Sequence, residues 1–343
     1  MAKVRVGLIG VGGMGGCHFY NYEKIADAEL VAVCDVRENV AKEKVGDRNI
    51  KIYTDYNKMI KNEDLDMIDI CTPSFLHADM AVKLLKKGYH VLCEKPMTLN
   101  TRDAKRVAAI ANQSEKNFMV AHVVRFMAPY TYLRNVIETK ELGRLIRLEM
   151  KRISAIPQWS WEDWMRDEKL SGGVTTDLSI HDFDFVQSVL GMPDKLNSYR
   201  YQMTNNNDTV VTSMIYDGDI LVTCEGTWYN TSIPFDASFT AVFQNGYVEL
   251  NKGKLIKNGK EVELNKEESP KVDLGINVGN DDGYLAEMSY FVNCIKEGKK
   301  PDYVTPESSA QSVVLADLIK KKSMKLLQSE SGNSCFFLRS ADI

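Results

Sequence analysis

Short apolar runs alternate with amphipathic segments through the first third of the chain. Five runs are expected as strands: Val4–Ile9, Leu30–Cys34, Met67–Cys71, His90–Cys93 and Phe118–His122. Four segments between them have helical patterns: Cys17–Ala26, Glu38–Lys44, His77–Lys87 and Arg102–Gln113. Unbroken apolar strands separated by helices are typical of a parallel sheet that is covered on both faces. The pattern therefore predicts an α/β fold that begins with a doubly wound Rossmann domain, residues 1–123.

The periodicity changes from about Gly143 onwards. Ile146, Leu148 and Met150 alternate with charged residues, which predicts a half-exposed strand. Pairs of turn residues between strand-like runs predict hairpins at Asp217-Gly218, Asn245-Gly246 and Asn258-Gly259. Two helical patterns follow, at Leu285–Lys296 and Pro306–Leu327. We expect a second α/β domain over residues 124–343, with an antiparallel sheet that carries helices. An alternative packs the C-terminal helix, residues 304–328, back on the first domain.

Composition excludes several classes of protein. The 343 residues include 43 basic and 47 acidic ones, which gives a formal net charge of −4. The chain therefore lacks the basic excess that is typical of a protein that binds nucleic acid. No apolar stretch reaches the length of a membrane span. The seven cysteines are an odd number without the close spacing of a metal or redox site, so we interpret them as reduced thiols in the cytoplasm.

A glycine-rich turn follows the first expected strand. Gly10, Gly12, Gly13 and Gly15, with Met14 between them, fit the pattern GxGxxG before a helix. Such glycines allow a tight turn and a close approach of the backbone to a pyrophosphate, which the helix N-terminus then stabilises. The sequence therefore predicts a dinucleotide site.

The residues after the second expected strand bear on the choice of cofactor. Asp35 ends that strand and can bind both ribose hydroxyls of an adenosine. Its carboxylate would repel the 2′-phosphate of NADP, whereas Arg37 could reach that phosphate. We expect NAD, with NADP as the alternative.

Two further segments carry groups suited to proton and hydride chemistry. Glu94-Lys95-Pro96 follows a strand directly, and ligands bind beyond the carboxyl ends of strands in such sheets. Asp177 and His181 lie four residues apart in a helix expected from about Thr176 to Gly191, and therefore on one face. A neutral imidazole can accept the proton of an alcohol while a carboxylate orients it.

These motifs together resemble the glucose–fructose oxidoreductase, inositol dehydrogenase and rhizopine-catabolism (Gfo/Idh/MocA) family of NAD(P)-dependent oxidoreductases, closest to the inositol dehydrogenase-like pattern. The matching segments run through most of the chain: the glycine turn, Thr72-Pro73 with His77, Glu94-Lys95-Pro96, Arg125-Phe126 with Pro129 and Tyr130, Gly172-Gly173 through Asp177 and His181 to Asp184, and the late Tyr284, Glu287 and Phe291.

The resemblance implies roles for particular residues. It implies that Lys95, Asp177 and His181 are catalytic and that Thr72, Pro73 and Glu94 line the cofactor. His77, beside them, is also a cofactor-site candidate, although packing at its helix start explains it equally well. His18 and His90 are interpreted as structural, His122 is left undecided, and no cluster supports a metal site. The resemblance also implies a second domain whose large, mostly antiparallel open sheet forms the interface of a homodimer or homotetramer.

The expected reaction transfers a hydride between the nicotinamide and a CH–OH or C=O carbon of a sugar, a sugar derivative or an inositol. Lys95 would bind the reacting oxygen and His181 would remove its proton, with Asp177 in support. Candidates for the substrate side are Arg125, Tyr130, Trp159, Trp161, Trp164 and Arg166. Two other functions stay open: a glycoside hydrolase that oxidises its substrate transiently with NAD, and a non-catalytic sensor of dinucleotide or sugar.

Overall fold

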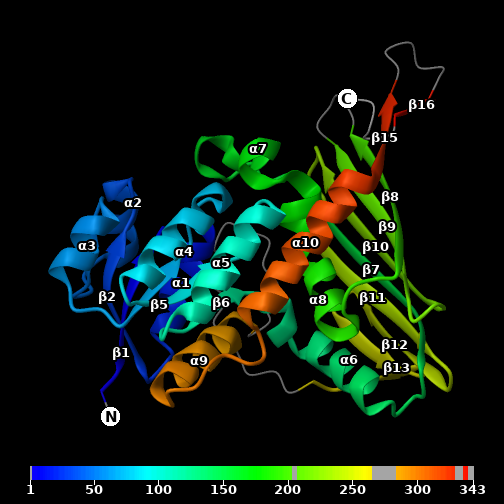
Figure 1. Ribbon diagram of the computed structural model, residues 1–343, viewed down its shortest axis with the longest axis horizontal. Helices are drawn as coiled ribbons and strands as arrows, with labels where there is room; N and C mark the ends of the chain where they lie inside the picture. The colour runs from blue at the N-terminus through cyan, green and yellow to red at the C-terminus, as the bar shows by residue number, and fades with distance from the viewer. Residues whose placement is uncertain (1, 203–206, 265–282, 329–334, 339–343) are drawn as a thin grey trace. The chain divides into compact units, whose positions relative to one another are not determined.

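The computed structural model describes residues 2–202, 207–264, 283–328 and 335–338 (Figure 1). Packing divides the chain into two compact units. The first comprises Met1–Phe126, Trp159–Met165 and Ser269–Ala310. The second comprises Met127–Gln158, Arg166–Glu268 and Gln311–Ile343. The chain therefore leaves the first unit near Phe126 and returns to it later.

The first unit is built on a six-stranded parallel sheet. Its strands are β1 (Val4–Ile9), β2 (Ala28–Cys34), β3 (Lys51–Tyr53), β4 (Met67–Ile70), β5 (His90–Glu94) and β6 (Phe118–Ala121). They follow the order β3-β2-β1-β4-β5-β6, with every neighbouring pair parallel. The order reverses between β1 and β4, and ligands bind beside such a switch point. The prediction of a doubly wound Rossmann sheet is confirmed.

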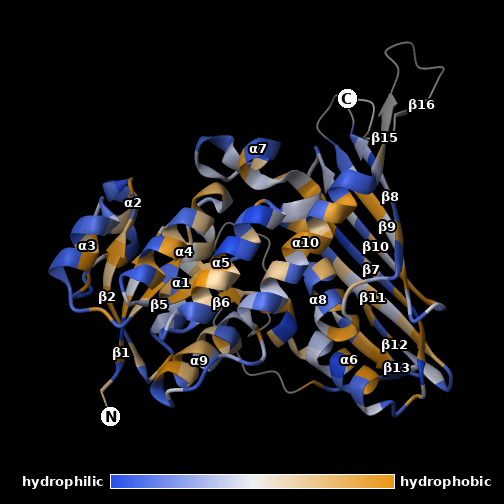
Figure 2. Cartoon of the chain, in the orientation of Figure 1, coloured by the Kyte–Doolittle hydropathy of each residue, from blue (hydrophilic) through white to orange (hydrophobic). Residues whose placement is uncertain are grey.

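Helices connect these strands. They are α1 (Gly13–Tyr22), α2 (Glu38–Val45), α3 (Tyr56–Asn62), the 3₁₀ turn η1 (Ser74–Leu76), α4 (His77–Lys86), α5 (Thr101–Gln113) and η2 (Val123–Phe126). The sequence pattern missed β3 and α3, which are short, and placed the start of α1 at Cys17. The helix begins four residues earlier because the glycine turn leads directly into it. In Figure 2, α5 carries both hydrophilic and hydrophobic residues, and its buried side consists of alanines and Val107.

A late helix completes the core of the first unit. Helix α9 (Gly283–Lys296) contributes Met288, Phe291 and Val292, which are fully buried, to a cluster with residues of β1, β4, β5 and β6. The sequence boundary at residue 123 groups α9 with the second domain. In the packed structure, α9 belongs to the first unit.

The second unit holds a ten-stranded mixed sheet. Its strands are β7 (Leu145–Ala155), β8 (Lys195–Gln202), β9 (Asp208–Tyr216), β10 (Ile220–Tyr229), β11 (Asp236–Phe243), β12 (Gly246–Asn251), β13 (Lys254–Lys257), β14 (Lys260–Glu261), β15 (Ser323–Gln328) and β16 (Cys335–Leu338). Their order is β14-β13-β12-β11-β7-β10-β9-β8-β15-β16. The pairs β7–β10 and β8–β15 are parallel and the others are antiparallel. The expected large, mostly antiparallel sheet is confirmed.

The three predicted hairpin turns join neighbouring antiparallel strands. At Asp217-Gly218 and Asn258-Gly259 both residues have positive φ, which is typical of the tight turns that match the twist of a hairpin. A fourth turn at Lys252-Gly253 has the same backbone conformation. The sequence did not reveal this turn because lysine rarely adopts positive φ.

One detail of strand β7 differs from the expected alternation. Leu148 and Met150 are buried, but Ile146 is 48% exposed although it lies two residues before Leu148. The pairing with β11 shifts register here, since Val242 faces Arg147 while Phe243 faces Leu145. This irregularity adds a residue and turns Ile146 to the other face of the sheet. The prediction that Ile146 and Leu148 share a face is wrong.

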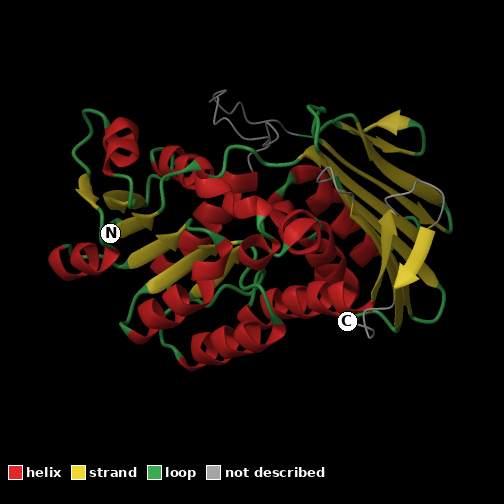
Figure 3. Ribbon diagram, turned by 90° about the horizontal axis from the view of Figure 1, so that it is seen from above, coloured by secondary structure: helices red, strands yellow, loops and turns green. Residues whose placement is uncertain are grey.

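The remaining helices are α6 (Ala128–Thr139), η3 (Trp161–Arg166), α7 (Glu168–Ser171), the π-helical turn η4 (Val174–Leu178), α8 (Ile180–Leu190) and α10 (Pro306–Lys322). Helices α6 and α8 lie on the same side of the sheet of the second unit (Figure 1), and Figure 3 shows the strands of this sheet from above. Helix α10 ends at Lys322, and the next residues form β15, so the prediction of a helix to Leu327 is wrong. Among the described residues, no helix has the length and hydropathy needed to cross a membrane.

Candidate active site

The glycine turn between β1 and α1 is built by close backbone contacts. Gly10 has φ +86°, and a Cβ atom there would lie 2.4 Å from the carbonyl oxygen of Cys71. A Cβ atom on Gly15 would lie 1.9 Å from the carbonyl oxygen of Gly10. Both positions therefore require glycine, and the two glycines allow the N-terminus of α1 to pack closely against the turn.

The middle of the turn has room for a ligand. Apart from its chain neighbours, the only atom of the described residues within 4 Å of a Cβ built on Gly12 is the Nη2 atom of Arg37, at 3.4 Å. Gly12, Gly13 and Met14 are each partly exposed, and α1 begins at Gly13. A pyrophosphate can thus approach the first amides of a ten-residue helix, which is the arrangement that binds phosphate groups.

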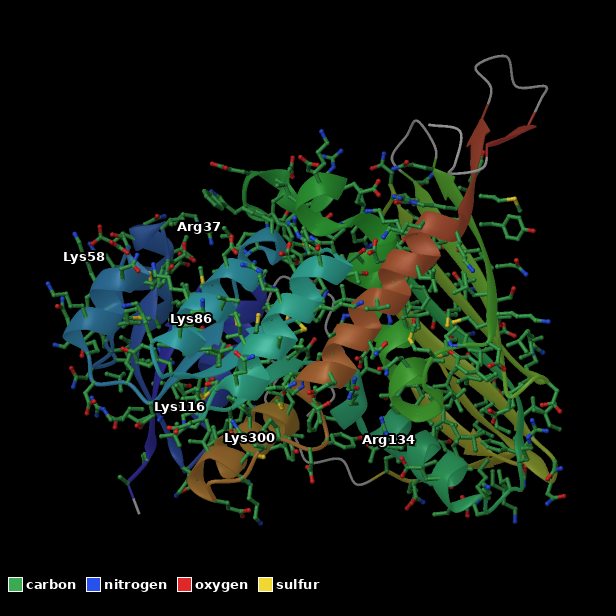
Figure 4. The ribbon with its side chains drawn as sticks, viewed as in Figure 1. Arg37, Lys58, Lys86, Lys116, Arg134 and Lys300 are labelled. Atoms are coloured by element: carbon green, nitrogen blue, oxygen red, sulfur yellow. The ribbon has the colours of Figure 1, made fainter. Side chains whose placement is uncertain are left out.

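Asp35 and Arg37 form a pair at the end of β2. The Asp35 carboxylate accepts hydrogen bonds from the Arg37 Nε, at 3.0 Å, and from its Nη2, at 3.1 Å. It also accepts from the backbone N–H groups of Val11 and Arg37. The guanidinium lies 5.7 Å from the centroid of the Trp161 ring, and Figure 4 labels Arg37 at this end of the sheet. Because Asp35 is already engaged, a ribose that binds it must displace Arg37.

His77 connects the two loops that follow β4 and β5. Its Nδ1 lies 2.8 Å from the carbonyl oxygen of Pro96, and its Nε2 lies 2.8 Å from that of Thr72. Burial lowers the pKa of His77. The lowered pKa favours the neutral imidazole, which donates to only one of the two carbonyls at a time. His77 positions Thr72 and Pro73, which are partly exposed, and is itself buried.

Glu94 turns into the protein at the end of β5. Its Oε2 accepts the backbone N–H of Lys95 at 3.0 Å, and its Oε1 lies 3.1 Å from the Nε2 atom of His18. The exposed fraction of Glu94 is 5%, whereas Lys95 is half-buried. Glu94 was expected to line the cofactor, but its carboxylate points into a buried polar cluster.

This cluster centres on His18 of α1. The Nδ1 atom of His18 lies 2.8 Å from the Oδ2 atom of Asp69, which also accepts the hydroxyl of Tyr22 at 2.7 Å. Ligand atoms of His18, Asp69 and Cys71 all lie within 4.8 Å of one another. Both ring nitrogens of His18 face carboxylates, however, so the ring carries two protons and offers no lone pair to a metal. The cluster is thus better described as an imidazolium held by carboxylates.

The catalytic candidates of the second unit follow a double glycine. Gly172 ends α7 with φ +83°, and a Cβ atom there would lie 2.4 Å from the Cβ of Thr176. The next turn, η4, is π-helical, with the N–H of Ser179 bonded to the carbonyl of Val174. Asp177 lies in η4, whereas His181 lies in the first turn of α8. The prediction of one regular helix from Thr176 is therefore wrong in detail.

Asp177 and His181 differ in exposure. Asp177 is 5% exposed, and His181 is half-buried. Residues four apart lie near one another in both α- and π-helical turns. A carboxylate one turn before an imidazole suits a proton-accepting histidine, because negative charge favours the protonated ring.

An ion-pair network anchors the segment that precedes Asp177. The Arg200 side chain, 2% exposed, makes paired hydrogen bonds with Glu168 and with Asp208. Lys320 of α10 reaches Glu168 at 2.9 Å. Burial opposes the ionisation of Glu168, but the hydrogen bonds and charges of Arg200 and Lys320 outweigh it and lower the pKa of Glu168 to about 2.

The substrate candidates fall into two groups. Arg125 is 1% exposed and donates to the carbonyl of Tyr303 and the hydroxyl of Ser308. Tyr130 is 2% exposed, accepts a hydrogen bond from Arg152 and packs on Phe185. Their contacts favour structural roles. Another group is more accessible: Trp159, Trp161 and Arg166 are exposed and Trp164 is half-buried.

Comparison with known sequences decides the family. The model of the "Oxidoreductase family, NAD-binding Rossmann fold" matches residues 4–122. The model of the same family's "C-terminal alpha/beta domain" matches residues 134–325, more than half of the chain. This chain belongs to the Gfo/Idh/MocA oxidoreductase family.

Individual relatives agree with this assignment. The chain is 30% identical over 193 residues to a myo-inositol 2-dehydrogenase of Thermotoga maritima, which covers 55% of each chain. It is 32% identical over 189 residues to an inositol 2-dehydrogenase of Rhizobium meliloti, again 55% of each. The match thus spans about half the length of these relatives. A levoglucosan dehydrogenase in complex with NADH and levoglucosan has the same fold, with a TM-score of 0.80 and 19% identity over 98% of this chain and 99% of its own.

Sequence reasoning missed one part of the site in this family member. His18 was interpreted as structural, and its link to Glu94 was not foreseen. One signal was available: Asp69 interrupts the otherwise apolar strand Met67–Ile70. A carboxylate that a strand buries completely needs a partner, and His18 on a buried side of α1 is one of only five histidines.

Proposed function

We propose that this chain is an NAD-dependent oxidoreductase that acts on a CH–OH or C=O carbon of a sugar, a sugar derivative or an inositol. The observation that carries the proposal is the glycine turn, which only glycine can form and which leaves its middle open beside Asp35. The names of the relatives, two inositol 2-dehydrogenases and a levoglucosan dehydrogenase, support this substrate class. The partner is then a small polyol or sugar.

We assign the chemistry to Lys95, Asp177 and His181. When bound, NAD supplies the hydride acceptor or donor. The Lys95 ammonium hydrogen-bonds the reacting oxygen and stabilises the negative charge that develops on it. His181 accepts the hydroxyl proton during oxidation, and the Asp177 carboxylate stabilises the resulting imidazolium. The turn from Gly10 to Gly15 would hold the pyrophosphate of the cofactor, and Thr72 and Pro73 lie at the same edge of the sheet. The exposed Trp161 and Arg166 and the half-buried Trp164 are the candidates that we keep for the substrate side.

Turnover by variants tests these roles. Lys95→Met and His181→Ala should each lower kcat by about 10²–10⁴-fold, the usual contribution of general acid–base groups. Asp177→Asn should fall between these variants and the wild type, because it keeps the size and polarity of the side chain but loses the charge. NADH affinity, followed by fluorescence, should change little, as it should in the control Lys58→Met. Near-normal turnover by His181→Ala would remove His181 as the base.

The preference for NAD rests on the Asp35 carboxylate. We expect a higher kcat/KM with NAD than with NADP, and Asp35→Ser should narrow or reverse the ratio because it also releases Arg37 to bind a 2′-phosphate. Steady-state kinetics with both cofactors measure this. A wild-type preference for NADP would show that Arg37 governs the pocket.

Two other functions are separated by the same assays. A glycoside hydrolase would release an aglycone without net reduction of NAD, whereas a sensor would bind NAD or sugar without turnover. A panel of inositols, aldoses, sugar acids and glycosides, followed both by cofactor absorbance and by product analysis, distinguishes all three.

We also propose that the chain forms a homodimer or homotetramer through its large sheet. On the strands of this sheet, Ile146, Tyr199 and Val211 are 48%, 42% and 43% exposed. Exposed large apolar side chains on one sheet favour its burial against another subunit. A monomer in light scattering at micromolar concentration would contradict this. The free thiols of the six described cysteines support a cytoplasmic location.

A further inference from the structure

His18 lies between two carboxylates in the interior of the first unit. Its side chain is fully buried, with Nδ1 at 2.8 Å from Asp69 of β4 and Nε2 at 3.1 Å from Glu94 of β5. A carboxylate only accepts hydrogen bonds, so the ring must donate from both nitrogens to make both contacts. The geometry thus favours an imidazolium that connects helix α1 to two neighbouring strands.

The titratable groups that face His18 are acids, thiols and phenols, so His18 is the group of this cluster that carries positive charge. From α1 it faces Cys17 and Tyr22, from β4 Asp69 and Cys71, from β5 Glu94, and from α9 Tyr284 and Glu287. Burial acts to lower the pKa of His18, but the charge of Asp69 raises it well above its ordinary value. Burial acts to raise the pKa of Glu94, but the hydrogen bond and charge of His18 lower it.

Glu287 shows how a carboxyl group in this cluster titrates when it has no hydrogen bond from His18. It is fully buried, and neither of its oxygens has a hydrogen-bond partner among the described residues. Burial and the nearby charge of Glu94 raise its pKa well above the ordinary value. Glu94 would face the same penalty if His18 were lost, and it would then protonate or turn away.

The position of Glu94 matters because its other oxygen holds Lys95. The Oε1 atom faces His18, while Oε2 accepts the backbone N–H of Lys95 at 3.0 Å. We propose that His18 is a positioning residue of the hydride-transfer site, which holds the Glu94 carboxylate so that the backbone of Lys95, and hence its ammonium group, keeps its orientation. This inference rests on the proposed role of Lys95.

Two replacements of His18 separate positioning from general packing. In His18→Gln the side-chain amide can take the place of Nε2 and donate to Glu94, whereas in His18→Asn it can take the place of Nδ1 and donate to Asp69. A shift of about 1 Å in a reacting group can cost about 10²-fold in rate. We therefore expect kcat to fall by about 10- to 100-fold in His18→Asn and by less than about threefold in His18→Gln, with little change in the KM for NAD in either.

If His18 had only a structural role, the two variants would rank differently in their loss of kcat. Asp69 makes the shorter contact with His18, so simple packing or stability favours His18→Asn or treats both variants alike. Equal kcat values, a larger loss in His18→Gln, or a loss confined to the KM for NAD would overturn the proposal.

Two NMR measurements give results that do not depend on activity. In protein labelled with ¹⁵N-lysine, the Lys95 amide proton, assigned through Lys95→Arg, should keep its shift in His18→Gln and move upfield in His18→Asn. In the unaltered protein labelled with ¹⁵N-histidine, His18 should carry protons on both ring nitrogens at neutral pH. A neutral His18 ring, or a Lys95 amide that is the same in all variants, would overturn the proposal even if a variant fails to fold.

These measurements also separate this inference from the proposed function. If Lys95→Met turned over normally, Lys95 would lose its proposed role, yet the amide shift would still show whether His18 positions its backbone.

Discussion

The two units each bury a cluster of charged side chains, and the clusters use different cations. In the second unit, the guanidinium of Arg200 makes paired hydrogen bonds with both Glu168 and Asp208. In the first unit, the imidazolium of His18 makes one contact with Asp69 and one with Glu94. A guanidinium stays charged at any pH at which a protein folds, whereas an imidazolium can lose its proton. The Arg200 cluster therefore keeps its cation at every pH at which the protein is folded. The His18 cluster keeps its geometry only while His18 is protonated.

The largest expected effect comes from removing the guanidinium. Arg200→Met leaves two carboxylates without their main partner, and breaking a buried ion pair in this way costs about 3–5 kcal/mol. Because Glu168 is one-third exposed, we expect a value near the lower end, about 3 kcal/mol, in the free energy of unfolding. Urea denaturation followed by circular dichroism measures this loss.

An exposed pair provides the matched control. Arg144 binds Asp219 at the surface, where the side chains are 44% and 64% exposed. Arg144→Met should lower the free energy of unfolding much less than Arg200→Met does, because water screens this exposed pair. Equal losses in Arg200→Met and Arg144→Met would show that the buried network contributes no special stability.

A smaller loss of stability is expected when a methyl group is placed against the Arg200 cluster. Gly173 has φ +68°, and a Cβ atom there would lie 3.1 Å from the Nη2 of Arg200. Gly191 has φ +78°, and in the part of the chain that the structure describes no atom beyond its chain neighbours lies within 4 Å of such a Cβ. With ψ of −168° and −152°, Gly173 and Gly191 lie in a backbone region that is essentially restricted to glycine, so both alanine variants incur about 1–3 kcal/mol of strain. The additional close contact with Arg200 should make Gly173→Ala the less stable of the two. A thermal midpoint for Gly173→Ala equal to that of Gly191→Ala would mean that Arg200 moves aside without cost.

The titration of His18 provides a test on the alkaline side. Its pKa in the folded protein is raised above the ordinary 6.5, so its contribution is complete below pH 6.5 and declines as the pH rises through the raised value. Where only the unfolded form has lost the proton, the decline is about 1.4 kcal/mol per pH unit. The stability difference between wild type and His18→Gln should narrow accordingly from pH 6.5 upward. A difference that stays constant would indicate a neutral ring.

A further effect is expected in acid, from Glu168. Its pKa is lowered to about 2, so its contribution is complete above pH 4.5 and is lost as the pH falls toward 2. The thermal midpoint of the wild type should therefore drop over this range more than that of Glu168→Gln. Parallel curves for the two proteins would show that the charge of Glu168 adds nothing to stability.

The sequence revealed those parts of the site that local patterns encode. The glycine turn, Asp35 and Lys95 each stand at the end of an apolar strand, where the position alone suggests a ligand. The contacts of His18 were hidden because its partners lie 51 and 76 residues away. The same holds for Arg200, whose contact with Glu168 joins residues 32 positions apart.

Local patterns also misled where packing overrides them. The exposed position of Ile146 depends on a register shift against β11, and no feature of the β7 sequence indicates it. Residues Ser323–Gln328 continue a helical pattern but pair with β8 as a strand. In both cases a neighbouring strand, distant in sequence, decides the backbone.

The place of α9 has a consequence for how the chain folds during synthesis. Phe291 and Val304 close a core whose other members, such as Val6 and Met119, are made much earlier. At ribosomal speed, the interval between the end of β6 and the emergence of α9 is on the order of ten seconds. During that time the nascent Rossmann sheet exposes an apolar face. We therefore expect the first unit to become stable only after α9 has been synthesised.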